Sequence, residues 1–182
     1  MSSRSPVENA DTINLIYALL VRFPEIASVR SMPGEGTLRF SLVLSGRLDR
    51  ASQRRVTSAV EEHVEGLLEL IGERPTQIGV EFETDKTMTF VHLTRDLETF
   101  SKDELLMLAG LFSQQFGDAL VRNPVPDEQL DDDPAAQDEM VEYAVESLRD
   151  PHQSKSLVGF REEKRVLVYF LKGQKKAKAS RS

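Results

Sequence analysis

The chain has 182 residues and a formal net charge of −7, with 40% hydrophobic residues, 29% charged residues and no cysteine. This length and composition are typical of one compact domain and argue against disorder of the whole chain. The lack of cysteine excludes disulfides, thiolate zinc sites and cysteine nucleophiles. No stretch approaches the about 20 apolar residues that span a bilayer. Since the first residues also lack the apolar run of a signal peptide, we expect a cytoplasmic location.

The charge is unevenly distributed along the chain. Residues 124–150 carry ten acidic residues against Arg149, whereas residues 153–182 carry nine basic residues against Glu162 and Glu163. Residues 173–182 have no apolar periodicity and are predicted to form a disordered basic tail. Because proteins that bind nucleic acids in general are more often basic overall, the balance favours an acidic protein with a basic tail.

The first half of the chain alternates helices with pairs of strands. Apolar residues at helical spacing predict a helix over 11–22, which Pro24 ends. Strands are expected near 26–32 and over 37–44, joined by a turn at 33–36. A second helix is expected over 49–71, followed by Gly72 as its left-handed end. Its predicted apolar face consists of Val56, Val60, His63, Val64, Leu67 and Ile71.

A second hairpin and the clearest helix start follow. The hairpin is expected over 77–93, with its turn centred on Asp85 and Lys86. Ser101 and Glu104 have the spacing of a capping box at the start of a third helix. This helix is apolar around much of its girth, which predicts burial between layers or against a partner subunit.

The chain then continues through an acidic connector, near 123–133, to a fourth helix over 134–148 and a third hairpin. The last strand of this hairpin, within 164–171, has apolar residues on both faces. This pattern predicts a strand covered on both sides, either a central strand or one at a dimer interface.

This order of elements predicts an α+β fold. We expect an antiparallel sheet built from three β-hairpins and covered by about four helices, in a single domain over 1–172. The order of helices and hairpins resembles that of the small acidic dimeric chaperones of the type III secretion class. The likeness concerns topology alone, because no motif is shared.

Three consecutive aspartates, at 131–133, lie at the end of the acidic connector. A calcium loop of the EF-hand type would place Asp131, Asp133 and Glu142 at its first, third and twelfth positions, but alanines occupy the fifth and sixth positions. We therefore predict no metal site. Asp133 is instead expected to cap the fourth helix, with Pro134 as its first residue.

The second hairpin contains the strongest candidate for a binding site. With a turn centred on Asp85 and Lys86, Glu81 lies opposite Phe90 and diagonal to His92. Met88, Phe90 and His92 are then on the strand face away from the core, where a helix, a partner subunit or a ligand should cover them. Glu81 and His92 could perform acid–base chemistry, although an ordinary cross-strand pair is the favoured interpretation.

The other histidines have less support as functional residues. His63 is expected to pack on the apolar face of the second helix, and His152 has no predicted partner. No histidine spacing typical of a zinc site occurs.

Three functions remain open. The favoured one is a non-catalytic interaction or regulatory protein acting as a homodimer, with a possible protein partner and no cofactor, because no catalytic constellation is recognisable. The first alternative is a small-molecule-binding protein or enzyme that uses Glu81 and His92 beside Met88 and Phe90. The second alternative, a nucleic-acid-associated factor, is the least favoured because its tail lacks aromatic residues for base stacking. The basic residues of that tail are Lys172, Lys175, Lys176, Lys178 and Arg181.

Overall fold

The computed structural model describes residue 13 and residues 16–123, 133–150, 155–162 and 165–171. These residues form a six-stranded antiparallel sheet with helices, which confirms the predicted α+β class. The strands are β1 (Ser28–Met32), β2 (Thr37–Ser45), β3 (Ile78–Asp85), β4 (Met88–Asp96), β5 (Leu157–Glu162) and β6 (Arg165–Phe170). The α-helices are α2 (Arg50–Leu70), α3 (Lys102–Phe116) and α4 (Pro134–Leu148), with short 3-10 helices η1 (Pro33–Glu35) and η2 (Gly117–Ala119). Residues 16–22 are also helical.

Consecutive strands pair with each other, and the pairs then combine into one sheet. β1 pairs with β2, β3 with β4 and β5 with β6, all antiparallel. Contacts of β2 with β4 and of β1 with β5 join the pairs in the order β3-β4-β2-β1-β5-β6. The three predicted hairpins therefore lie side by side, with the first in the middle.

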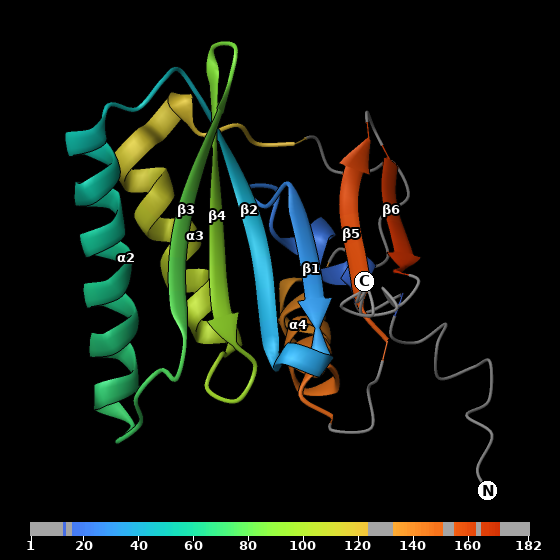
Figure 1. Cartoon of the computed structure of the whole chain (residues 1–182). Helices are drawn as coiled ribbons and strands as arrows, with labels where there is room; N and C mark the ends of the chain where they lie inside the picture. Colours follow the sequence, from blue (N-terminus) through green and yellow to red (C-terminus); the bar gives the residue numbers. More distant parts are fainter. Residues whose placement is uncertain (1–12, 14–15, 124–132, 151–154, 163–164, 172–182) are drawn as a thin grey trace, which may run out of the picture.

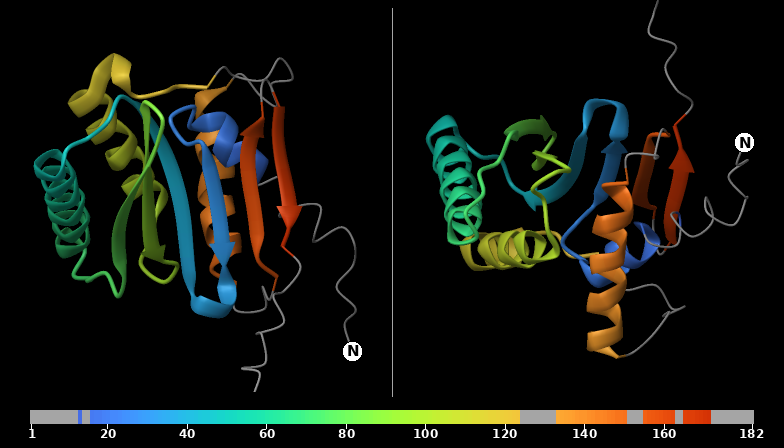
Figure 2. Two further views of the ribbon diagram at one scale, coloured as in Figure 1. Left: turned by 45° about the horizontal axis from the view of Figure 1, so that its top comes forward. Right: turned by 90° about the horizontal axis from the view of Figure 1, so that it is seen from below.

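The helices lie on one side of the sheet. In Figure 1, α3, α4 and the helical residues 16–22 lie behind the strands, and Figure 2 shows the same layering from below. α2 stands at the edge of the molecule, beside β3 and α3. The core fills the space between the sheet and these helices. No helix in the described part of the chain covers the other side of the sheet, and we call that side the open face.

Side-chain caps define the starts of α2 and α4, and the cap of α4 was predicted. The Asp49 carboxylate accepts a hydrogen bond from the Ser52 N–H at 2.7 Å at the start of α2. The Asp133 carboxylate accepts one from the Ala135 N–H at 3.1 Å, and Pro134 is the first residue of α4. The prediction that Asp133 is a helix cap is confirmed. Asp131 lies outside the described residues.

The capping box at α3 forms only in part. The Ser101 hydroxyl accepts a hydrogen bond from the Glu104 N–H at 3.3 Å. The Glu104 side chain does not complete the box, because both of its oxygens accept hydrogen bonds from Arg95 of β4. A charged guanidinium in a buried site is a stronger partner than a neutral backbone N–H, and tertiary contact therefore overrides the local pattern.

Two predictions about the edges of the molecule are wrong. His63 is exposed, with Nδ1 at 2.6 Å from the Ala59 carbonyl oxygen, and Ile71 is 64% exposed. The buried side chains of α2 are spaced four residues apart, at Val56, Val60, Val64 and Leu68. This spacing indicates that the helix crosses its neighbours obliquely. As a result, the side chain of His63 lies outside the row of residues that contact the core. β6 pairs with β5 alone and is an edge strand, which excludes the central strand, while the alternative of a strand at a dimer interface stays a prediction.

The N-terminal helical segment approaches β5 closely at Gly159. A Cβ atom at this position would lie 2.7 Å from Cγ2 of Ile16 and 3.0 Å from Cδ1 of Leu20. Next to it, the Arg161 guanidinium donates hydrogen bonds to the carbonyl oxygens of Leu20, Phe23 and Ile26 at the end of the helix. Position 159 requires glycine because there is no space for a side chain. Arg161 satisfies carbonyl groups that have no partner within the helical segment. None of the described helices is long and apolar enough to cross a membrane.

Candidate functional site

The hairpin of β3 and β4 places its polar and aromatic residues on the open face, but with a different register from the predicted one. Glu81 lies directly opposite His92, and Glu83 lies opposite Phe90. The predicted pairing is wrong by two residues because the strands connect through Lys86 and Thr87, with Lys86 at a φ of 55°. A shift of two residues leaves each side chain on its original face. Met88, Phe90 and His92 are therefore on the face away from the core, as predicted, and are half-buried.

A hydrogen-bonded row crosses three strands at His92. The Ser41 Oγ on β2 lies 2.6 Å from His92 Nδ1, and His92 Nε2 lies 3.2 Å from Glu83 Oε2 on β3. The Phe90 ring stacks beside the imidazole, with ring centroids 6.4 Å apart. Glu81 does not take this place, because its carboxylate accepts a hydrogen bond from Arg39 at 3.2 Å.

The row of Ser41, His92 and Glu83 has the order of a nucleophile, a base and an orienting carboxylate. If Nε2 donates its hydrogen to Glu83, Nδ1 accepts the Ser41 hydroxyl hydrogen. Acyl transfer also requires donors for an oxyanion, which typically lie in loops or at helix N-termini. Ser41 lies within β2, paired with Ser28 on one side and His92 on the other. The row can therefore exchange a proton, but its backbone surroundings are those of a sheet.

Two arginines lie at the centre of the open face. Arg30 of β1 and Arg39 of β2 are directly opposite each other. Like charges in this position destabilise a sheet. Arg39 is paired with Glu81, whereas Arg30 is exposed and has no ion-pair partner within the described residues. The centre of the open face thus carries a guanidinium that is free to meet an external carboxylate.

Apolar side chains lie on both sides of this arginine pair. Val43, Met88 and Phe90 are on one side, from β2 and β4. On the other side are Val158, Phe160, Leu167 and Tyr169, from β5 and β6. The Phe160 and Tyr169 rings lie 5.9 Å apart, and Tyr169 is 52% exposed. The open face therefore combines apolar flanks with a cationic centre.

The sequence alone did not identify Arg30, Arg39 or Ser41 as site residues. Their alternation with core residues placed them on the outer face of two strands. However, no local signal indicated that β2 would lie between β1 and β4, which is the arrangement that brings these residues together.

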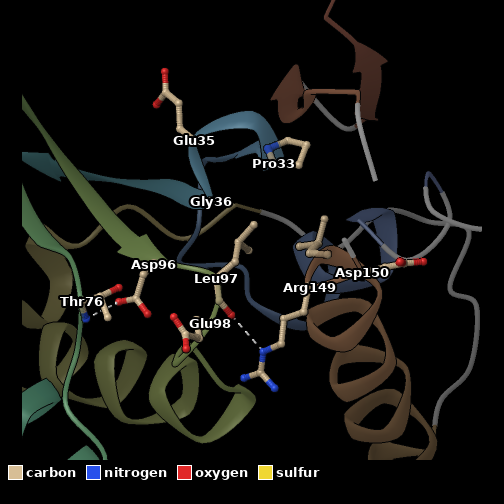
Figure 3. A pocket seen from close by; sticks show the side chains of 10 residues that line it. Pro33, Glu35, Gly36, Thr76, Asp96, Leu97, Glu98, Arg149 and Asp150 are labelled. Carbon is tan, nitrogen blue, oxygen red and sulfur yellow. Dashed lines mark hydrogen bonds between the residues drawn. The ribbon is translucent and has the colours of Figure 1, made fainter. Parts of the chain in front are cut away.

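A hollow of about 520 Å³ lies at one end of the sheet (Figure 3). Its lining residues are Pro33, Glu35, Gly36, Thr76, Asp96, Leu97, Glu98, Leu148, Arg149 and Asp150. Arg149 donates a hydrogen bond from Nε to the Leu97 carbonyl oxygen at 3.0 Å. The Glu35 side chain points away from Arg149 in Figure 3. Two smaller hollows lie along α2 and between α3 and α4. None of the three is lined by the row at His92, and no group of three or more potential metal ligands occurs among the described residues.

A buried ionic cluster lies behind the sheet, next to this hollow. Arg95 donates to both Glu104 oxygens, at 2.7 and 2.9 Å, and also hydrogen bonds to Asp96. Asp96 further accepts hydrogen bonds from the N–H groups of Thr76 and Gln77, at 3.1 Å each. We call Arg95, Asp96 and Glu104 the buried cluster. It ties β4 to α3 and to the segment that leads into β3.

Burial and hydrogen bonding oppose each other in this cluster. Burial acts to raise the pKa of Asp96. The Thr99 hydroxyl, the Gln77 N–H and the Arg95 guanidinium outweigh this effect and lower the pKa to about 2. For Glu104 burial is the dominant effect and raises its pKa, although Arg95 opposes the rise. All three side chains have partners within the fold, which indicates a structural role.

The basic residues of the predicted tail, Lys172, Lys175, Lys176, Lys178 and Arg181, lie outside the described residues, as does His152. Their roles therefore stay predictions.

Comparison of the chain with protein-family models, with curated proteins and with solved structures found no match.

Proposed function

We propose that this chain is a non-catalytic interaction protein whose open face binds a protein partner that presents carboxylates among apolar side chains. The observation that carries the proposal is the exposed guanidinium of Arg30, directly opposite Arg39 on β2 and beside the apolar Val158 on β5. Arginine and aromatic residues dominate the binding energy of protein interfaces. A partner carboxylate would offset the like-charge contact of the two arginines.

The proposal includes a homodimer and a cytoplasmic location, as expected from the sequence. The partner site on the open face is supported by the half-buried state of Met88, Phe90 and His92, on a face that no described helix covers. Such side chains lose little conformational freedom when a partner covers them, because their neighbours already restrict them.

The second candidate is a small-molecule-binding protein or enzyme that uses the open face. The short contact of Ser41 with His92 and the contact of His92 with Glu83 favour it, whereas Glu81 is engaged with Arg39. Replacing His92 by Phe would distinguish the two functions. It retains an aromatic side chain for a protein partner but removes proton transfer. The nucleic-acid alternative, through the basic tail, would be tested by deleting residues 173–182 and measuring the salt dependence of binding.

The partner can be identified and tested by site-specific cross-linking. A photo-reactive amino acid at Phe90 should capture a partner that the same amino acid at Tyr143 does not capture. Tyr143 is 74% exposed on α4 and serves as the matched position. The captured protein is then purified, and its affinity is measured by calorimetry for the intact chain and for single variants.

We expect Arg30→Ala and Phe90→Ala to weaken this binding at least about tenfold, because central arginine and aromatic residues are hot spots. Tyr143→Ala should leave the affinity unchanged. Equal affinity of all three variants would contradict the proposal, as would capture of the same proteins from positions 90 and 143.

A further inference from the structure

The charges on the outward face of α2 run against the dipole of the helix. Arg50, Arg54 and Arg55 lie in its first two turns, and its second half carries the acidic residues Glu61, Glu62, Glu65 and Glu69. A helix favours negative charge near its N-terminus and positive charge near its C-terminus. α2 has no acidic residue in its first turn and no basic residue in its last turn. Within the monomer, Arg54 and Arg55 gain an attraction to the Asp49 carboxylate, but the helix dipole does not favour this order of charges.

These charged side chains are also unpaired. Arg54, Arg55, Glu62, Glu65 and Glu69 are exposed, and none of them takes part in an ion pair within the described residues. Arg55 donates a hydrogen bond to the Ser52 hydroxyl at 3.0 Å, and besides the Ser52 N–H, Arg54 and Arg55 both help to lower the pKa of the Asp49 carboxyl at the helix N-cap. Figure 2 shows that α2 stands at the edge of the molecule.

The middle of the outward face of α2 is hollowed, because small side chains lie there. A hollow of about 340 Å³ runs along it, lined by Ala51, Arg54, Arg55, Ser58, Ala59 and Glu62. Ser58 and Ala59 separate the basic half of the face from the acidic half. Small side chains at the middle of a helix allow another helix to approach closely.

We propose that two copies of the chain associate through α2, packed antiparallel, with Arg54 and Arg55 of one copy facing Glu62 and Glu65 of the other across Ser58 and Ala59. This inference rests on the homodimer part of the proposed function. It adds the surface that forms the dimer and leaves the open face accessible to a different partner.

A second copy is the occupant that this pattern of charge fits. A two-fold interface requires a self-complementary surface, on which residue i contacts residue j and j contacts i. A basic half and an acidic half on one helix meet this requirement only when the two helices are antiparallel, because a parallel pair would place arginine against arginine. The antiparallel arrangement also opposes the two helix dipoles.

The test uses the full chain and two double variants of opposite charge. Arg54→Glu with Arg55→Glu makes the face acidic, and Glu62→Arg with Glu65→Arg makes it basic. Light scattering and sedimentation should find the intact chain dimeric at micromolar concentration. Each double variant alone should have a dimer dissociation constant about 10- to 100-fold higher, because like charges then oppose each other. Mixing the two variants should restore a dimer that contains one copy of each.

The control variant, Arg47→Glu with Arg74→Glu, changes the net charge equally at two exposed positions outside α2. It should dimerise like the intact chain. Both test variants place charge in the order that the helix dipole favours, so circular dichroism should find them folded and no less stable to heat.

The possible failures have different meanings. A strictly monomeric intact chain would overturn this inference together with the homodimer part of the proposed function. A dimer that is insensitive to both double variants, or that is not restored on mixing, would overturn only the role of α2. Loss of partner binding at the open face, with the dimer intact, would overturn the proposed partner site and leave the α2 dimer standing.

Discussion

The two faces of the sheet use the same kinds of residue in opposite ways. Behind the sheet, Arg95 is 1% exposed, and its guanidinium is bonded to Asp96, Glu104, Thr99 and the Gln77 carbonyl. On the open face, Arg30 is exposed beside Arg39 and has no ion-pair partner in the described part of the chain. A buried charge must have partners within the fold, whereas an exposed charge is solvated by water and stays available to an external partner.

This comparison indicates how a polar cluster can be assigned to structure or to a site. The pKa values of Asp96 and Glu104 in the buried cluster are shifted, and such shifts often mark functional sites. Here, however, the shifts come from burial and from hydrogen bonds that hold β4 to α3. The row at His92 is less buried and reaches solvent through Glu83, whose side chain is 71% exposed. Accessibility therefore decides the assignment.

The largest effect is expected from removing the central residue of the buried cluster. Arg95→Met should destabilise the fold by about 3–5 kcal/mol, because two carboxylates would remain buried without their partner. Arg30→Met on the open face is the matched control and should change stability by less than about 0.5 kcal/mol. Urea denaturation followed by circular dichroism measures both. Equal costs for the two variants would contradict the contrast between the faces.

If Arg95→Met does not fold, Arg95→Lys still tests the cluster. Lysine keeps the charge but loses the two-pronged contact with Glu104, so its cost should lie between those of Arg95→Met and Arg30→Met.

Two glycines provide the next test, since one lies on each face. Gly159→Ala should cost about 1–3 kcal/mol, because the added methyl group would overlap Ile16 and Leu20 of the N-terminal helical segment. At Gly79, a Cβ atom would meet Thr94 at 3.5 Å, an ordinary contact. Gly79→Ala should therefore be neutral or stabilising, by up to about 1 kcal/mol. Thermal unfolding compares the two variants. A cost at Gly159 no larger than that at Gly79 would show that the N-terminal helical segment does not pack against β5 as described.

The pH dependence of stability tests the charge state of the buried cluster. The pKa of Asp96 is about 2 in the fold, below its ordinary value of 3.8. In this range the unfolded chain binds more protons than the folded one, so the contribution of Asp96 is present above about pH 4 and is lost as the pH falls towards 2. The free energy by which the intact chain exceeds Asp96→Asn should therefore shrink between pH 5 and pH 3 in urea titrations. A constant difference would show that folding does not lower the pKa of Asp96.

The smallest effect is expected at Thr37, which is compared with a second buried threonine, Thr89. Thr37 is on the strand face away from the core, and its hydroxyl has no hydrogen-bond partner within the described part of the chain. Thr37→Val should be neutral or stabilise the fold by up to about 1 kcal/mol, because it removes an unsatisfied polar group. The hydroxyl of Thr89 donates to the Gly46 carbonyl at 2.7 Å and accepts from the Leu48 N–H at 3.3 Å.

Thr89→Val is therefore the matched control and should cost about 1–3 kcal/mol. Chemical denaturation of the two variants gives the difference directly. A loss of stability in Thr37→Val as large as that in Thr89→Val would show that the Thr37 hydroxyl has a partner after all.

The sequence predicted the elements better than it predicted their neighbours. The cap at Asp133 and the strand over 37–44 depend on residues a few positions apart, and both were correct. The register of β3 and β4 was wrong by two residues, because turn composition did not distinguish Lys86 and Thr87 from Asp85 and Lys86 as the turn. His63 was misplaced because the tilt of α2 across its neighbours is not encoded in local spacing.

The sequence by itself determined which segments become helices and strands and which side of each strand is apolar, since these depend on propensity, capping and periodicity within a few residues. Only the tertiary structure decided that the first hairpin lies between the other two. That order brings Ser41 to His92, 51 residues away. The packing of α3 behind β4 also pairs Glu104 with Arg95 instead of with its own cap. Both contacts depend on how the elements pack together, and burial of the whole core decides that packing.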